Sequence, residues 1–102
     1  MKLWVDDIRP APDGYVWCKS VLDAVVKICD GEKCAPLSKG RVVLLDIDHD
    51  AGDYVNEGGD YIKLLDWLEA TDRNYPIHIH SMNPVGVQNM RAIIEKNGWT
   101  EV

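Results

Sequence analysis

A short apolar run in the middle of the chain constrains the fold more than any other feature. Residues 42–47 read Val-Val-Leu-Leu-Asp-Ile, so a strand built from them has no polar face. Strands of this kind are buried on both faces, and they occur in parallel sheets that helices cover. Similar short runs stand at residues 2–6, 15–18 and 76–80. We therefore expect a sheet of four mostly parallel strands, with residues 42–47 inside it.

Segments with helical spacing lie between these strands. The first begins after Ser20, which forms a capping-box pattern with Asp23, and Gly31 is expected to end it. Apolar residues recur along it at helical spacing, at Val21, Leu22, Val25, Val26 and Cys29. A polar loop is expected over residues 32–40, which contain Pro36 and Gly40.

Two further helices follow the later strands. One is expected at about residues 60–70, with an inward stripe made of Tyr61, Leu64, Leu65 and Leu68. The other is capped by Asn83, has Pro84 in its first turn and ends at Gly98. Its inward positions are Val87, Met90, Ile93 and Ile94. Strands that alternate with helices predict right-handed crossovers, and hence one α/β domain over residues 1–102.

Composition limits the classes of function. The net charge of −6 argues against a broad nucleic-acid surface, which needs a footprint of Lys and Arg. A small phosphorylated ligand is still compatible, because a metal ion can reverse the local field. The cysteines (Cys18, Cys29 and Cys34) lack paired spacing, so we expect reduced thiols. With no signal region and no membrane-spanning run, the expected location is the cytoplasm. The oligomeric state does not follow from the sequence.

Acidic and histidine residues follow three of the predicted strands. Asp6 and Asp7 end the first, Asp48-His49-Asp50 follows the third, and His80-Ser81-Met82-Asn83 ends the fourth. Because ligands bind beyond the carboxyl ends of parallel strands, these runs are expected to meet at one edge. Such crowding of carboxylates needs a cation, and Arg9 could supply part of that charge.

Less specific readings apply to several of these residues. Asp7 could cap a turn, and Asp50 could belong to a solvated loop. Ser81 and Asn83 could be helix caps, a role that is compatible with anion binding at a helix N-terminus. His78 and His80 share a face of the strand, with His80 at the tip and His78 deeper, in a supporting position.

The tryptophans are interpreted mainly as packing residues. Trp4 and Trp67 occupy predicted core positions, and Trp99 is expected to pack back on the domain. Trp17 and Tyr15 could form a platform for a base, although packing against the neighbouring helix is the preferred interpretation.

Residues 44–47 and 64–68 resemble the central strand and following helix of response-regulator receiver domains. Asp6-Asp7 is similar to the metal-binding acidic pair of those domains, and Ser81 falls where they carry Ser or Thr. A closer resemblance is to the cyclic-phosphate-processing receiver-like domains, a divergent branch. It rests on residues 2–14, Asp48-His49-Asp50, residues 78–86 and residues 89–92. The resemblance implies a truncated receiver (flavodoxin-like) three-layer α/β fold, with about three helices.

The sequence departs from the receiver pattern in three places. No Lys is available where receivers carry one on a fifth strand to contact the phosphoryl group. The helix between the first two strands is replaced by a loop containing Pro10, Pro12 and Gly14. The loop at residues 50–59 is longer than the usual family run, so the substrate preference could differ.

The leading hypothesis from the sequence is a metal-assisted phosphoesterase acting on cyclic phosphates of nucleotides or RNA ends. A divalent metal is expected on four carboxylates, those of Asp6, Asp7, Asp48 and Asp50. Oxygen ligands favour Mg²⁺ or Mn²⁺ over Zn²⁺, whereas direct histidine ligation would favour Mn²⁺ or Zn²⁺. His80 and His49 are the candidates for general acid and base, with His78 in support. The phosphate is expected near Arg9, Ser81, Asn83 and Gly86.

Two alternatives belong to other classes of function. A non-catalytic receiver-like sensor or interaction module could bind a divalent metal or a phosphorylated ligand and accept a phosphoryl group on Asp46 or Asp48. A structural subunit could use the acidic edge to bind a basic partner. The missing Lys disfavours phosphotransfer, and the histidines disfavour a merely inherited site.

Overall fold

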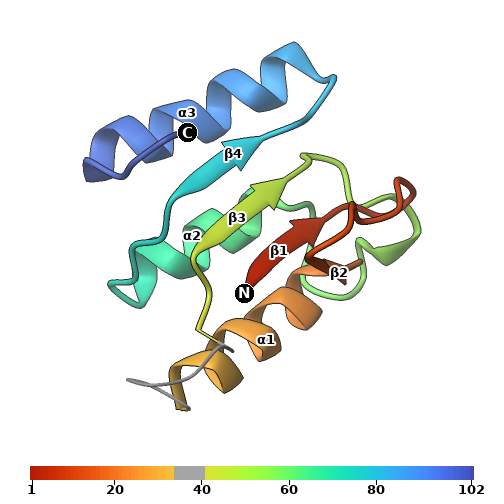
Figure 1. Ribbon diagram of the computed structural model, residues 1–102. Coiled ribbons are helices and arrows are strands. Elements are labelled where there is room, and N and C mark those ends of the chain that lie inside the picture. The colour runs from red at the N-terminus through yellow and green to blue at the C-terminus, as the bar shows by residue number, and fades with distance from the viewer. Residues whose placement is uncertain (34–40) are drawn as a thin grey trace.

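The computed structural model describes residues 1–33 and 41–102. Its elements, shown in Figure 1, are β1 (Lys2–Val5), β2 (Tyr15–Cys18), α1 (Val21–Lys33), β3 (Leu44–Ile47), a 3-10 turn (Gly52–Tyr54), α2 (Ile62–Ala70), β4 (Ile77–Ile79) and α3 (Pro84–Asn97). The strands are all parallel, in the order β2-β1-β3-β4. This arrangement confirms the α/β class and the truncated receiver topology. Strands β1, β3 and β4 are slightly shorter than the apolar runs that predicted them, whereas β2 has the predicted bounds.

The core lies between the sheet and its helices. The strand residues that face the helices are fully buried, as Leu3, Val5, Leu45, Ile47 and Ile77 show. Helix α2 packs against both α1 and α3, and Figure 1 shows it behind the strands. In the described residues the helices cover this face alone, so two of the three expected layers are present.

The opposite face of the sheet carries the side chains that alternate with the core residues. Strand register places Trp4 beside Trp17 on one side and Asp46 on the other, with His78 next to Asp46. No helix of residues 1–33 and 41–102 covers this face. The reason is local: residues 7–14, which connect β1 to β2, contain two prolines that exclude a helix and Gly14 at a φ of +85°.

Helix α1 differs from its prediction at its end and in its inward stripe. It continues past Gly31 to Lys33, so residues 32 and 33 are helical, and the rest of the predicted loop (34–40, with Cys34) lies outside the described residues. The buried positions are Val21, Ala24, Ile28 and Gly31. Leu22 and Val26 are instead 55% and 52% exposed. The small residues Ala24 and Gly31 let the helix approach the sheet closely. The helix therefore buries the face that carries them, and the face with Leu22 and Val26 stays exposed.

The helix caps follow the sequence closely. Ser20 Oγ accepts a bond from Asp23 N at 3.0 Å, although the Asp23 carboxylate pairs with Lys27 instead of closing a capping box. Asn83 Oδ1 accepts from Gly86 N at 3.0 Å, and Gly98 ends α3 at a φ of +66°. The inward stripe predicted for α2 is confirmed, since all of its members are buried.

The last residues of the chain lie along the free edge of β4. Ile77 N donates to Thr100 O and Val102 N donates to Ile77 O, in a parallel bridge between Ile77 and Glu101. Trp99 packs against the core, as predicted. This segment pairs with the edge of β4 that β3 does not occupy. Cys18 and Cys29 are free thiols. No helix in the described parts of the chain is long and apolar enough to span a bilayer.

Candidate functional site

Asp6 is the anchor of the carboxyl edge of the sheet. It follows β1 directly, and its side chain is fully buried. Its Oδ1 accepts from the backbone N–H groups of Ile8 and Arg9, both at 2.9 Å, which turns the chain away from the strand. Burial raises the pKa of this carboxyl, but the two backbone bonds, the bond to His80 and the charge of Arg9 outweigh it. The pKa of Asp6 is therefore lower than usual.

His80 joins two of these carboxylates. Its Nδ1 lies 2.7 Å from Asp46 Oδ1, and its Nε2 lies 2.9 Å from Asp6 Oδ2. The strand register produces this contact, because β3 lies between β1 and β4 and holds Asp46 on the face that His80 shares. A neutral imidazole can donate to only one of the two oxygens, so the other contact needs a second proton or a cation between the atoms.

Two tryptophans hold this network in place. The Trp4 ring stacks on the His80 ring with centroids 3.8 Å apart and planes 3° apart, and its Nε1 donates to Arg9 O at 2.8 Å. Trp17 Nε1 donates to Asp6 O at 2.7 Å. The interpretation of Trp4 as a core residue is wrong, because register places it on the face that the helices do not cover. Its alternation with the core residues Leu3 and Val5 is the sequence signal for this placement.

Arg9 carries the positive charge at this edge. Its Nε lies 3.1 Å from Asp6 Oδ2, and its Nη2 lies 3.2 Å from Asp48 Oδ2. A third bond of 3.3 Å goes to His80 O. The side chain is nevertheless 45% exposed, so the guanidinium is accessible from solvent.

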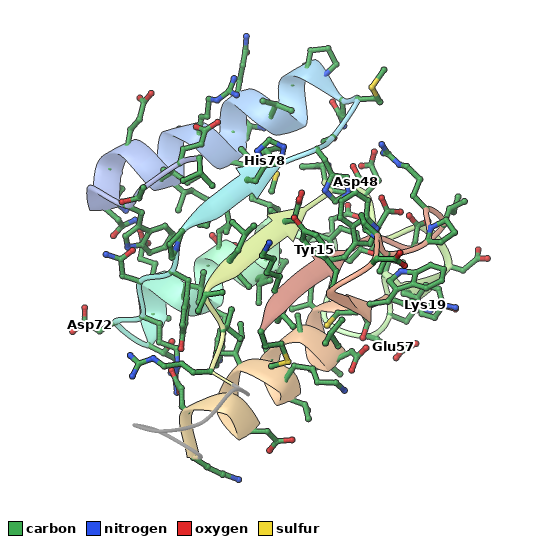
Figure 2. The ribbon with its side chains drawn as sticks, in the orientation of Figure 1. Tyr15, Lys19, Asp48, Glu57, Asp72 and His78 are labelled. Atoms are coloured by element: carbon green, nitrogen blue, oxygen red, sulfur yellow. The ribbon has the colours of Figure 1, made fainter. Side chains whose placement is uncertain are left out.

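The Asp48-His49-Asp50 run turns at the end of β3. Asp48 is buried, and its Oδ1 accepts from His49 N at 2.7 Å; Figure 2 shows Asp48 at this end of the sheet. His49 Nδ1 lies 2.8 Å from Asp50 Oδ1, so Asp50 faces His49 and not the other carboxylates. The flat side of the His49 ring lies on Gly86, where an added Cβ would be 2.5 Å from Cγ and Cδ2. Gly86, predicted near the phosphate, therefore positions His49.

Asp7 lies at the same edge but in a different environment. It is half-buried, and its Oδ2 contacts the backbone at Gly52, where no side chain would fit. Burial and the charges of Asp6 and Asp48 raise the pKa of this carboxyl. Burial and the charges of Asp6 and Asp48 therefore make the Asp7 carboxyl hold its proton more readily than an ordinary Asp does.

Some predicted site residues have other partners in the described structure. His78 is exposed, and its Nδ1 lies 2.7 Å from Val102 O, away from the carboxylates (Figure 2). Ser81 Oγ accepts from Asn83 N at 3.1 Å, and Asn83 in turn caps Gly86. The backbone N–H groups of Asn83 and Gly86, near which the phosphate was expected, thus already have acceptors.

A group of three side chains could hold a metal ion. Asp6, Asp48 and His80 each offer one ligand atom, and these atoms lie within 4.8 Å of one another. Two carboxylates and an imidazole suit a divalent cation of the Mn²⁺ or Zn²⁺ type, and the acidic surroundings suit any divalent cation. The donor set therefore fits a divalent cation, which would displace Arg9 from its contacts with Asp6 and Asp48.

A family model described as the cyclic-phosphate processing receiver domain matches residues 1–96. No curated protein and no solved structure matches the chain.

Proposed function

The chain belongs to the cyclic-phosphate processing receiver domain family, and from this premise we propose that it is a metal-assisted phosphoesterase acting on cyclic phosphates of nucleotides or RNA ends. One observation carries the proposal. The buried carboxylates of Asp46 and Asp6 are joined by half-buried His80 in a bonded chain that ends at the exposed guanidinium of Arg9. Such a network offers proton transfer and anion binding at one point, which hydrolysis of a phosphodiester needs.

Arg9 is the proposed phosphate-binding group. Its guanidinium is charged at all relevant pH values and pairs well with phosphate oxygens. Its contacts with Asp6 and Asp48 place it at the edge of the sheet, beside the carboxylates that would hold the ion. Asp6, Asp7 and Asp48 would hold the divalent ion, for which we propose Mg²⁺ or Mn²⁺. When bound, that ion supplies polarisation of the phosphoryl oxygens and a lower pKa for water.

His49 and His80 are the proposed base and acid. Asp50 fixes Nδ1 of His49, which leaves Nε2 to take a proton from the attacking water. A bond forms between the water oxygen and phosphorus as the ester bond to one ribose oxygen breaks. That oxygen receives a proton from His80, which Asp46 and the Trp4 stack hold in position. The product is a phosphomonoester with one free hydroxyl.

Hydrolysis of a panel of cyclic phosphates tests the proposal. The 2′,3′-cyclic and 3′,5′-cyclic nucleotides are incubated with Mg²⁺, Mn²⁺ or Zn²⁺, and product is measured by chromatography. We expect metal-dependent turnover that falls roughly 100-fold in His49→Ala and in His80→Ala, as loss of an acid or base requires. Asp48→Asn should lower turnover through loss of metal.

His78→Ala is the matched control. The Nδ1 atom of His78 bonds to Val102 O, and His78 has no hydrogen bond or ion pair with the carboxylates of Asp6, Asp46 and Asp48. It should keep wild-type turnover. Absence of turnover across the panel, or equal losses in all three histidine variants, would contradict the proposal.

The sensor alternative has less support. Asp46 and Asp48 are only 6% and 8% exposed, and Asp46 is already bonded to His80. A phosphoryl donor therefore has poor access to either carboxylate. Incubation with acetyl phosphate, followed by intact mass, tests this alternative: a metal-dependent phosphate adduct would favour the sensor over the enzyme.

A further inference from the structure

A groove lies beside the acidic edge and has no role in the chemistry described above. Its volume is about 610 Å³, and it lies between β2, the first turns of α1 and residues 54–57. Its lining includes the aromatic side chains of Trp17 and Tyr54 and the exposed apolar side chains of Leu22 and Val26. Figure 2 shows the polar lining residues Lys19 and Glu57 close together, on the side of the molecule where Asp48 lies.

The groove is joined to the acidic edge through Trp17. The indole that lines the groove donates from Nε1 to Asp6 O, and the Asp6 carboxylate contacts both His80 and Arg9. The Lys19 ammonium lies 4.4 Å from the centroid of the Trp17 ring and helps to fix the ring. A ligand in the groove would thus contact Trp17, which is bonded to Asp6 of the acidic edge.

The other wall of the groove is built by the long loop after β3. Leu22 N donates to Glu57 O at 3.1 Å, which ties this loop to the start of α1. Gly58, at a φ of +112°, lets the loop backbone come so close to Val21 that an added Cβ would be 2.7 Å from Val21 Cβ. The wall is therefore attached to the domain and does not depend on a ligand for its position.

We propose that this groove binds the nucleobase of the substrate, an assignment that rests on the proposed function for the phosphate end of the ligand. The volume falls within the range of small-molecule sites, roughly 300–1,000 Å³. Aromatic and apolar side chains bind the faces of a base, because stacking on an aromatic ring tolerates any base. The ribose then bridges the distance from the groove to Arg9.

Glu57 gives the groove a preference among bases. Its carboxylate is exposed and takes part in no hydrogen bond or ion pair within the described residues. A carboxylate accepts from the exocyclic amino group of cytosine, adenine or guanine. In uracil the N3–H donor is flanked by two carbonyl oxygens, which repel a carboxylate. Cytidine should therefore bind more tightly than uridine.

Binding of nucleosides that lack phosphate tests the groove apart from catalysis. The full chain, labelled with ¹⁵N, is titrated with cytidine and with uridine while the indole N–H signal of Trp17 is followed by NMR. We expect a saturable shift with cytidine and a weaker one with uridine. Glu57→Ala should remove most of the difference between the two nucleosides.

Two matched variants test where the nucleoside binds. Val26→Arg places a long charged side chain in the groove and should weaken cytidine binding roughly tenfold or more, the scale of a lost stacking contact. Val43→Arg changes a residue of similar exposure, 56% against 52%, outside the groove lining, and should leave the affinity unchanged. Thermal midpoints of both variants check that each is folded.

The outcomes separate this inference from the proposed function. Cytidine binding that Val26→Arg weakens, without turnover of any cyclic phosphate, keeps the groove as a nucleoside site and rejects the enzyme. Turnover without a saturable cytidine shift at Trp17, or a cytidine affinity that Val26→Arg leaves unchanged, overturns the groove alone.

Discussion

At the scale of single residues, the contact between Gly86 and His49 places the proposed base. The imidazole lies flat on the first turn of α3, in space that any side chain at position 86 would fill. On its other side Asp50 fixes Nδ1. Gly86, which has no side chain, therefore determines where the proposed base points.

Gly86→Ala tests this positioning. The added methyl group displaces His49, and a misplacement on the scale of an ångström lowers turnover by roughly 100-fold. Stability should change little, because Ala favours a helix over Gly by about 1 kcal/mol and offsets the clash. Turnover and thermal unfolding are measured side by side. In a His49→Ala background the same substitution should cause almost no further loss, and a full second loss would show that Gly86 acts elsewhere.

The sequence predicted the chemistry-bearing residues better than the residues that hold them. Asp6, Asp48 and His80 could be identified as neighbours from the sequence, because each follows a recognisable strand. The carboxyl ends of parallel strands share an edge. The supporting contacts of Trp4 and Gly86 depend on register and on the packing of α3 against the edge. The alternation of Trp4 with Leu3 and Val5 indicates which face of the strand it occupies, but neither contact has a local signature in the sequence.

At the scale of elements, an ion-pair cluster joins the end of α1 to the segment before β4. The Glu32 carboxylate accepts hydrogen bonds from Nε and Nη2 of Arg73, at 2.9–3.1 Å. It also accepts one from the Tyr75 hydroxyl. These bonds lower the pKa of Glu32, with Arg73 as the larger cause. They also explain why α1 continues past Gly31, since the last turn places Glu32 opposite Arg73.

Glu32→Gln should therefore have a pH-dependent effect on stability. Because the folded pKa lies below the ordinary value of 4.5, the stabilisation is present above that pH and disappears as pH falls through the folded pKa. At pH 7 we expect a loss of about 1 kcal/mol, since both side chains are partly exposed. Urea unfolding of both proteins between pH 3 and pH 7 measures the difference. A constant difference over this range would exclude the charged pair as the cause.

Helix caps were easier to predict than the course of α1. Ser20, Asn83 and Gly98 act through local bonds or backbone geometry, which the sequence shows directly. The buried stripe of α1 depends on how closely the helix approaches the sheet, so Ala24 and Gly31 were overlooked in favour of Leu22 and Val26. Those two exposed residues instead line the proposed nucleobase groove.

At the scale of the whole molecule, the proposed metal site at the acidic edge would couple ion binding to stability. Asp6, Asp7 and Asp48 crowd one edge, and Arg9 is the cation that contacts two of them. A cation that binds the folded state alone stabilises it by about 2.7 kcal/mol when its concentration is 100 times its Kd. The overall fold could be predicted from the alternation of strands and helices. Which carboxylates lie close enough to share an ion depends on distances between side chains, and the sequence does not show these distances.

Mg²⁺ or Mn²⁺ should therefore raise the thermal midpoint, and a chelator should reverse the increase. Asp48→Asn should abolish it, while Asp66→Asn, which changes an exposed acid on α2, should not. His80→Ala distinguishes its two possible roles. An unchanged response to both ions supports His80 as a proton donor, and a selective loss of the Mn²⁺ response shows that His80 ligates the ion.

The contact between His80 and Asp6 joins positions that are 74 residues apart in the chain. Contacts of such sequence separation form late, because the intervening chain must first be ordered. Helix α1 and the strands β1 and β2 can associate without completing the site. During refolding, recovery of activity should therefore coincide with docking of β4 and lag behind the recovery of helical circular dichroism.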